Sequence, residues 1–165
     1  MTQAMAVRPP PLMHKTAALQ CDDRKVVLEA DCFSFMEDSL ACTRQKLTFF
    51  DKAGNKKLNE KIFSPAPKQP EDAYPIVEEK IGELMCVEAK SREKYFVASI
   101  SNGGNCDECE WFEVYGMNGK SIGSTRSKKK SKLVNGIVDA AFDKTAKRVS
   151  NKNELPGFYS KNSAR

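Results

Sequence analysis

Cysteine is the residue type in this chain whose number and spacing point most directly to chemistry. A CxxC pair stands in the stretch SNGGNCDECEWFEVYG. Such a pair can belong to a zinc knuckle, to a thioredoxin-like redox centre or to a disulfide that closes a turn. The chain holds six cysteines, an even number that permits three disulfides. They are Cys21, Cys32, Cys42, Cys86, Cys106 and Cys109.

The zinc and redox interpretations lack residues that they need. A structural zinc site uses four thiolate or imidazole ligands, most often from two close pairs. The sequence has one close pair, and its single histidine, His14, lies near the N-terminus. A redox centre places CxxC at the start of a helix, whereas Trp111 and the residues after it have the pattern of a strand. Asp107 and Glu108 add negative charge that disfavours a thiolate. A zinc or redox protein that uses the CxxC pair therefore ranks third, after the two functional hypotheses given at the end of this section.

A structural role fits the cysteine spacing better. The ends of a β-turn lie within about 7 Å of each other, which overlaps the Cα separation of a disulfide. The same geometry can close a loop earlier in the chain, and the last pair then ties the N-terminal segment to the middle. The predicted pairs are Cys106–Cys109, Cys32–Cys42 and Cys21–Cys86, with buried free thiols as the alternative. Three disulfides favour a periplasmic or secreted protein, with a cytoplasmic location as the alternative.

Charged residues around and after the CxxC pair are the candidates for contact with a partner. A half-exposed Trp111 and Tyr115 beside the carboxylates would form an anchor for a protein partner. A place in the core is the competing interpretation for a Trp in a strand. The basic run that follows could contact the same partner, or the phosphates of nucleic acid or anionic lipid. The candidates are Asp107, Glu108, Glu110, Trp111, Tyr115, Arg126, Lys128, Lys129, Lys130 and Lys132.

Alternating apolar residues predict the strands that position these side chains. Residues 25–35 form one strand by period-two alternation, and residues 44–63 form a hairpin around an Ala-Gly-Asn turn. Residues 83–101 contain two apolar runs around a polar turn, which indicates two strands. Residues 110–124 form a second hairpin, in which Asn118-Gly119 predicts a type I′ turn.

The order of these features repeats along the chain. A strand, a cysteine-containing loop, an aromatic strand, a glycine turn and a further strand occur twice, at a separation of about 65 residues. The repetition indicates two similar three-stranded meanders, packed or placed in succession. The proline-rich residues 64–75 lie between them and form a surface loop or linker.

The C-terminal third changes from strand to helix periodicity. Apolar residues at helical spacing in 131–150 predict an amphipathic helix, with Lys144, Lys147 and Arg148 in its last turns, where cations favour the helix dipole. We therefore expect an α+β fold, mainly β, with antiparallel meander sheets of about six to eight short strands and one C-terminal amphipathic helix. The expected organisation is an extended or disordered lead-in at 1–22, a single β-rich globular domain at 23–150 and a tail at 151–165.

Charge is unevenly divided along the 165 residues. The chain carries 27 Lys and Arg against 22 Asp and Glu, a net charge of +5. Residues 126–165 hold eleven of the basic and three of the acidic residues, or +8, which leaves 16 against 19, or −3, for residues 1–125. A charged partner should therefore distinguish the two parts of the chain.

No apolar run is long enough for a membrane span, and no intact signal-peptide pattern is visible.

No combination of residues indicates catalysis. A Ser-His-Asp or Cys-His arrangement would depend on His14 alone, so we expect no enzyme activity and no bound metal or cofactor. The leading hypothesis is a non-catalytic protein-binding module, a small bacterial-type inhibitor or immunity protein that blocks a partner such as a toxin or an enzyme. The first alternative is a binder of nucleic acid or of an anionic surface through the basic C-terminal third.

Overall fold

The computed structural model describes residues 7–51, 54, 56–155 and 157–161, which form nine strands and one α-helix. The first sheet has the order β1-β2-β3-β4, and the second has the order β8-β7-β6-β5-β9. All strand pairings among the described residues are antiparallel. The elements are β1 Met13–Cys21, β2 Arg24–Met36, β3 Ser39–Phe50, β4 Lys57–Phe63, β5 Lys80–Glu88, β6 Lys94–Ser101, β7 Glu110–Tyr115, β8 Ser121–Ser124, α1 Lys132–Ala141 and β9 Val149–Glu154.

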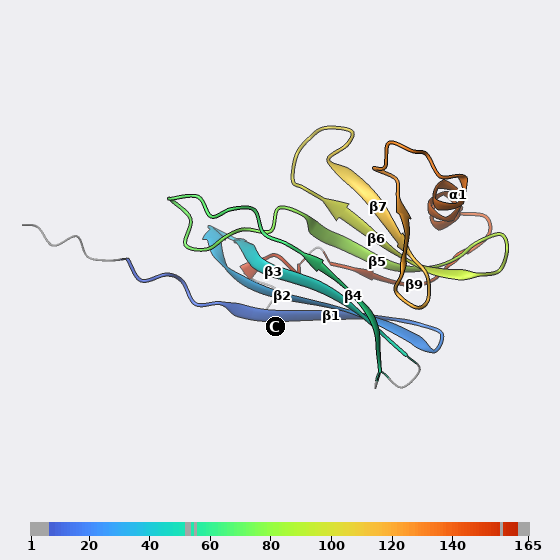
Figure 1. Cartoon of the computed structure of the whole chain (residues 1–165), viewed down its shortest axis with the longest axis horizontal. Coiled ribbons are helices and arrows are strands. Elements are labelled where there is room, and N and C mark those ends of the chain that lie inside the picture. The colour runs from blue at the N-terminus through green and yellow to red at the C-terminus, as the bar shows by residue number, and fades with distance from the viewer. Residues whose placement is uncertain (1–6, 52–53, 55, 156, 162–165) are drawn as a thin grey trace, which may run out of the picture.

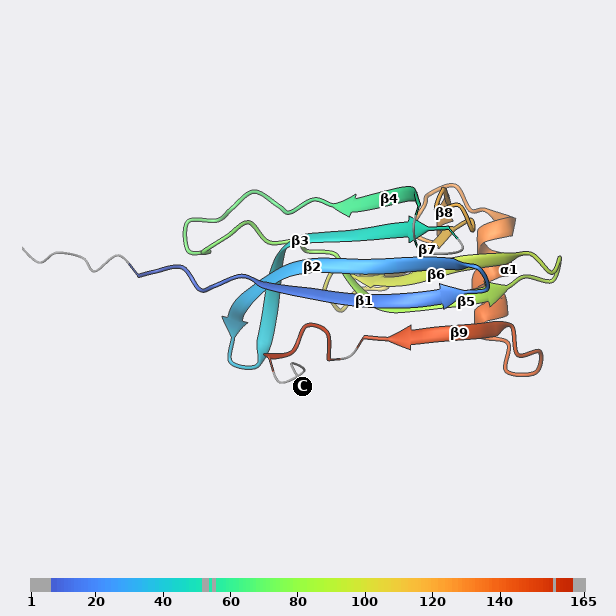
Figure 2. The ribbon, with the colours of Figure 1, turned by 90° about the horizontal axis from the view of Figure 1, so that it is seen from below.

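The main apolar core lies between the two sheets, which pack face to face (Figures 1 and 2). Alternation in β2 turns Val26 and Leu28 inward, because successive side chains of a strand point to opposite faces. Aromatic rings join the sheets: the Phe49 centroid lies 5.6 Å from Phe96 and 5.1 Å from Tyr115. The predicted strands at 25–35, 44–63 and 83–101 are therefore confirmed in type, and the fold is mainly β.

Helix α1 covers the other face of the second sheet (Figure 1). Its buried residues Val134, Ile137 and Val138 pack against strand residues such as Val97 and Val114. The side chain of Ser131 caps the helix by accepting a hydrogen bond from the backbone N–H of Val134. The molecule thus has three layers, with one sheet in the middle.

The two halves of the chain have the same strand order, as the repeated sequence pattern predicts. Strands β1–β4 and β5–β8 form two successive up-and-down meanders, of four strands each instead of the predicted three. The disulfide Cys21–Cys86 joins β1 to β5, the first strand of each meander, and its sequence separation of 65 equals the spacing of the repeat. Strand β9 adds to the second meander after the helix.

Two strands lie where the sequence predicts none, and this raises the number of strands to nine. Residues 13–21 of the expected lead-in form β1, because Leu19 and Cys21 alternate into the core. Strand β9 begins before the expected tail and runs into it, although it has almost no apolar residues. Backbone pairing with β5 holds it, and the side-chain amides of Asn151 and Asn153 donate to β1 carbonyl oxygens at 2.7 and 3.0 Å.

The helix and one turn also differ from the prediction. Helix α1 ends at Ala141, so the cations expected in its last turns follow it instead; Arg148 pairs with Glu88 at 3.4 Å. In the β7–β8 hairpin Gly119 has a φ of 79°, whereas Asn118 is not among the described residues with positive φ. The turn is therefore a type I turn followed by a left-handed glycine, not type I′, because the loop has one more residue than a two-residue hairpin.

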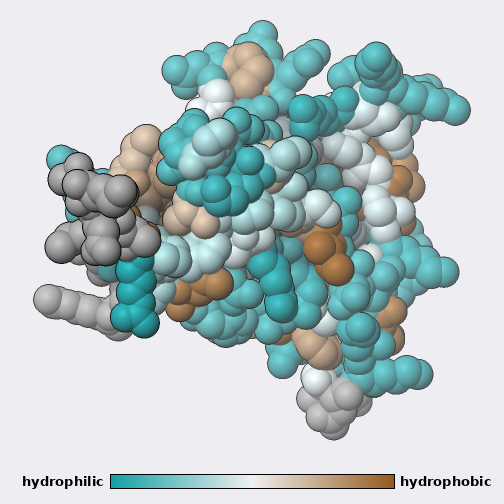
Figure 3. Space-filling model, turned by 60° about the vertical axis from the view of Figure 1, so that its left-hand side comes forward, coloured by the Kyte–Doolittle hydropathy of each residue, from teal (hydrophilic) through white to brown (hydrophobic). Residues whose placement is uncertain are grey.

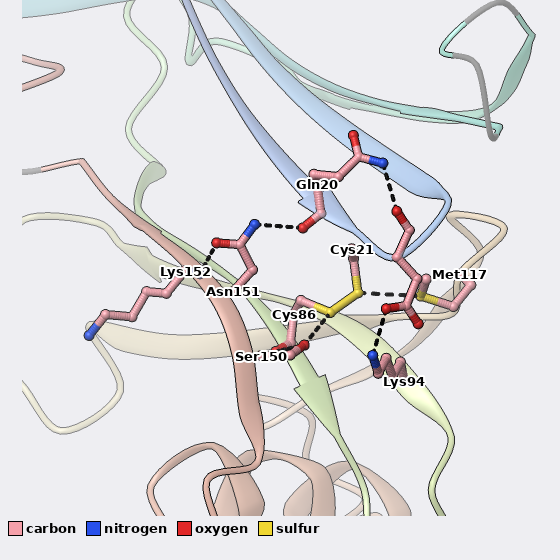
Figure 4. Close-up of a disulfide and its surroundings, with 9 residues drawn as sticks. Gln20, Cys21, Cys86, Lys94, Met117, Ser150, Asn151 and Lys152 are labelled. Atoms are coloured by element: carbon pink, nitrogen blue, oxygen red, sulfur yellow. Dashed lines mark hydrogen bonds and ion pairs between the residues drawn. A yellow bond between two sulfur atoms is a disulfide. The ribbon is translucent and has the colours of Figure 1, made fainter.

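The sheets are fastened to each other along the β1 and β9 edges. Figure 4 shows the disulfide Cys21–Cys86 among the groups that surround it, with the hydroxyl of Ser150 3.1 Å from the Cys86 sulfur. On the other side of the disulfide, Lys94 and Asp22 form an ion pair of 2.6 Å between the sheets. In the part of the chain that the structure describes, no helix has both the length and the apolar character needed to cross a membrane.

Candidate partner-binding surface

Two loops at the same end of the sandwich are each closed by a disulfide. Cys32–Cys42 joins β2 to β3 just before their hairpin, with a Cα separation of 3.8 Å. Cys106–Cys109 closes a turn between β6 and β7, with a Cα separation of 5.1 Å. Figure 1 shows that β2 and β6 run toward the same end, where the segment between β4 and β5 crosses from one sheet to the other. We call residues 34–39, 64–79 and 102–110 the loop end.

The disulfide pairs are those that the cysteine spacing predicts. All six sulfurs are paired, and no described cysteine is free. Three disulfides are typical of an oxidising environment. A zinc site would require these sulfurs as thiolates.

The crossing segment is held against strands β2 and β3 of the first sheet. The N–H of Val77 donates to the Cys42 carbonyl at 2.8 Å, and the side-chain amide of Gln45 donates to the Glu79 carbonyl at 2.9 Å. The ring of Tyr74 packs on Phe33, with centroids 4.9 Å apart. These contacts order the middle of the loop end without a regular strand.

The CxxC turn is ordered by backbone bonds as well as by its disulfide. The N–H of Cys109 donates to the Cys106 carbonyl, and the N–H of Asn102 donates to the Cys109 carbonyl, both at 3.0 Å. Gly104 packs so closely that a Cβ there would lie 2.5 Å from the Cys109 sulfur. Asp107 and Glu108 are exposed on the outside of this turn, and neither side chain forms an ion pair or hydrogen bond within the described part of the chain. The loop therefore presents its carboxylates to solvent from a fixed backbone.

Carboxylates dominate the loop end. Its three segments contain nine Asp and Glu and one Lys, a net charge of −8 on a chain whose total is +5. Within the described residues, Glu79 is the one carboxylate of the loop end that forms an ion pair, with Arg126 at 3.6 Å. The nine are Glu37, Asp38, Glu71, Asp72, Glu78, Glu79, Asp107, Glu108 and Glu110. The end is therefore acidic and largely unneutralised.

Two apolar side chains are exposed at the tip of the first loop. Phe35 is 45% exposed and Met36 is 63% exposed. Figure 3 turns this side of the molecule toward the viewer and shows apolar residues as small separate areas in a mostly hydrophilic surface. The surface thus offers local apolar contacts within a charged setting, not one broad apolar patch.

The two aromatic candidates for partner contact lie in the core instead. Trp111 is 4% exposed and Tyr115 is 2% exposed, since the second sheet is covered on both faces. The guanidinium of Arg126 stacks over the Trp111 ring, 4.2 Å from its centroid. The Tyr115 hydroxyl donates to the Glu113 carboxylate, and burial raises the pKa of this phenol far above its ordinary value. The prediction that Trp111 and Tyr115 form a half-exposed anchor is therefore wrong, and both side chains belong to the core.

The structure brings the acidic loop and the basic run together. A concavity of about 300 Å³ lies between them, with Trp111 at its wall. Asp107, Glu108, Glu110, Arg126 and Lys130 line it. The remaining basic candidates, Lys128, Lys129 and Lys132, are exposed beside it. From the sequence, the acidic loop and the basic run are predicted as separate contact surfaces. In the folded chain they are neighbours.

Sequence reasoning missed part of the loop end. Phe35, Met36 and the carboxylates of 37–38 and 71–79 were not among the candidates, because nothing local links them to the CxxC turn. A count of charges in the loops alone, after the strands are assigned, would have identified them. The single histidine, His14, lies on the exposed face of the first sheet, opposite Asp31 and next to Cys32 in β2, with Nδ1 2.7 Å from Asp31.

Within the described residues, no group of three or more His, Cys, Asp or Glu side chains is arranged to hold a metal ion. Comparison of the chain with models of protein families, with curated proteins and with solved structures gave no match. The functional argument therefore rests on the geometry and charge of this surface.

Proposed function

We propose that this protein is a non-catalytic protein-binding module of the inhibitor or immunity type, which blocks a partner protein by placing its loop end against a cationic surface. The observation that carries the proposal is an exposed end with a net charge of −8, ordered by two disulfides. The three disulfides support action in an oxidising compartment, the periplasm or the exterior of the cell.

Preorganisation supports a binding role for these loops. Ordering a flexible loop costs free energy when a complex forms, and a loop that is already closed by a disulfide avoids much of that cost. Cys32–Cys42 and Cys106–Cys109 close two of the three segments that form this end. A ready-made surface of this kind suits an inhibitor, whose partner must be held tightly without chemistry.

Charge and apolar contacts then have separate roles. Unpaired carboxylates attract a cationic partner over a distance and speed the encounter. Phe35 and Met36 can supply the apolar contacts that slow dissociation once the surfaces meet.

The alternative, a nucleic-acid or anionic-surface binder, has less support. Its basic run lies directly beside Asp107, Glu108 and Glu110 across one concavity. A polyanion that approached Arg126 or Lys130 would meet these carboxylates, and like charges repel.

A charge-matched pair of triple variants tests the proposal. The first is Asp107→Asn, Glu108→Gln and Glu110→Gln in the loop end. The control, Asp23→Asn, Glu60→Gln and Asp139→Asn, changes the net charge equally at exposed sites elsewhere. Each protein is immobilised and exposed to an extract of an oxidising compartment, and the captured proteins are quantified by mass spectrometry.

The captured amount of a partner protein should be about tenfold lower with the first triple variant than with the unaltered chain. With the control it should be less than twofold lower. Raising the salt concentration should weaken capture in the same way, because exposed charges are screened. Equal capture by all three proteins would contradict the proposal, and so would capture of nucleic acid instead of protein.

A further inference from the structure

The three disulfides differ in their exposure to solvent. Cys21 and Cys86 are 1% and 0% exposed, and the pair Cys32–Cys42 is equally buried. In the third pair Cys109 is buried, but Cys106 is exposed. A reductant can therefore reach the third disulfide in the folded protein, whereas the other two require the sheets to open.

We propose that Cys106–Cys109 is a thiol–disulfide exchange site, reduced in the native protein by a dithiol of the kind carried by thiol–disulfide oxidoreductases. Exchange begins when a thiolate attacks one sulfur and displaces the other. Gly104 packs on the sulfur of Cys109, where a Cβ would come within 2.5 Å. This contact shields Cys109, so the thiolate attacks the sulfur of Cys106 and the bonding electron pair leaves with Cys109.

The electrons and protons balance with a dithiol donor. The first step gives a mixed disulfide between Cys106 and the donor, with Cys109 as the thiolate that takes up a proton. The second thiol of the donor then attacks its own sulfur in the mixed disulfide and releases Cys106. The donor ends as a disulfide, and Cys106 and Cys109 end as thiols, after transfer of two electrons and two protons.

Reduction changes the loop and leaves the fold intact. The pairing of β6 with β7 begins at Ser101 and Glu110, outside the four-residue segment 106–109 that the disulfide closes. After reduction the CxxC turn keeps backbone bonds to Cys106 and Cys109 at its base, but loses its covalent closure. Local opening of this kind is independent of global unfolding.

The exchange site has a consequence for binding that rests on the proposed function. Asp107 lies between the two cysteines and belongs to the proposed contact surface. Reduction makes this segment flexible, so a partner must order it on binding and the affinity falls. The redox state of Cys106–Cys109 would thus regulate the inhibitor.

Partial reduction under native conditions tests the exchange site. Dithiothreitol is the probe, free thiols are trapped with N-ethylmaleimide at increasing times, and peptide mass mapping locates the label. We expect Cys106 and Cys109 to be labelled at least about tenfold faster than the other four cysteines, with an unchanged circular dichroism spectrum. Equal rates for all three disulfides, or loss of the fold together with the first label, would overturn the proposal.

A second measurement separates the exchange site from its consequence. The variant Cys106→Ser with Cys109→Ser mimics the open loop, and the partner found by the charge-variant experiment is titrated against it. A several-fold loss of affinity supports redox regulation, and an unchanged affinity overturns the regulation while the exchange site stands. If the unaltered chain captures no partner, the proposed function fails, and the labelling rates still decide whether Cys106–Cys109 exchanges.

Discussion

At the scale of single residues, Gly119 is where the second hairpin meets the first sheet. Its φ of 79° lies in the left-handed region, and a Cβ there would come within 2.5 Å of the Phe49 ring. Phe49 is fully buried and packs between Phe96 and Tyr115. A side chain at this position would therefore strain the backbone and displace a central core residue.

Gly119→Ala should lower the free energy of unfolding by about 2 to 4 kcal/mol, from the left-handed backbone and the overpacked ring together. The control is Gly82→Ala in β5, where a Cβ would meet nothing within 4 Å. We expect the control to change stability by less than about 1 kcal/mol. Urea unfolding of both variants measures the difference, and equal losses would contradict the packing described at Phe49.

One buried phenol, Tyr115, and one partly buried phenol, Tyr159, make the free energy of unfolding depend on pH in the alkaline range. Burial raises the pKa of Tyr159, an effect partly offset by the N–H of Ile81, which donates to the phenol oxygen. Burial and the Glu113 carboxylate raise the pKa of Tyr115. Each phenol keeps its proton in the folded chain but loses it in the unfolded chain above about pH 10, the ordinary value for tyrosine. Protons then favour the folded state, so stability must fall as the pH rises above that value.

Ultraviolet absorbance of tyrosinate checks this dependence. We expect Tyr115 and Tyr159 to ionise only when the protein unfolds, and Tyr115→Phe to reduce the slope of unfolding free energy against pH by about one proton. Reversible ionisation of all four tyrosines near pH 10 in the folded protein would show that these two phenols are not shielded from solvent.

At the scale of elements, the disulfides constrain chain segments of very different length. Their sequence separations are 65, 10 and 3 residues, and the longest also joins the two sheets. A crosslink stabilises mainly by restricting the unfolded chain, and this restriction grows with the length of the closed loop.

Replacing each pair of cysteines by alanine should therefore give a ranked loss of stability. The expected losses are about 4 kcal/mol for Cys21–Cys86, about 3 kcal/mol for Cys32–Cys42 and about 2 kcal/mol for Cys106–Cys109. Urea unfolding of the three double variants measures them. If Cys106–Cys109 gave the largest loss, its disulfide would support the core, and the loop could not open by itself.

The sequence predicts elements well where burial on one face is strong. β2, β3 and β6 carry alternating or continuous apolar residues, and the order of loops between them is enough to predict the disulfide pairs. β1 and β9 escape prediction because partners far away in the chain hold them, β9 through the amides of Asn151 and Asn153. The burial of Trp111 could not be predicted from the sequence either, because alternation does not show which faces of a sheet a helix or a second sheet will cover.

At the scale of the whole molecule, the acidic loop end and the basic residues that follow β8 form neighbouring surfaces of opposite charge. The loop end carries a net charge of −8, whereas residues 126–152, which include α1 and both loops beside it, hold nine Lys and Arg against two Asp, or +7. The sequence shows the basic part as a run, but the acidic end forms only when three distant loops meet. Such a dipole orients the molecule before contact with a charged partner.

Site-specific photo-crosslinking tests the central claim most directly. A photoreactive amino acid replaces Met36 or Asn105 in the loop end, and Asp23 or Lys90 in the turns at the opposite end of the strands. After irradiation in an extract of an oxidising compartment, adducts are resolved by mass. The account predicts that the same partner protein is crosslinked from both loop-end positions and from neither opposite position. A partner crosslinked equally from both ends, or from the opposite end alone, would contradict it.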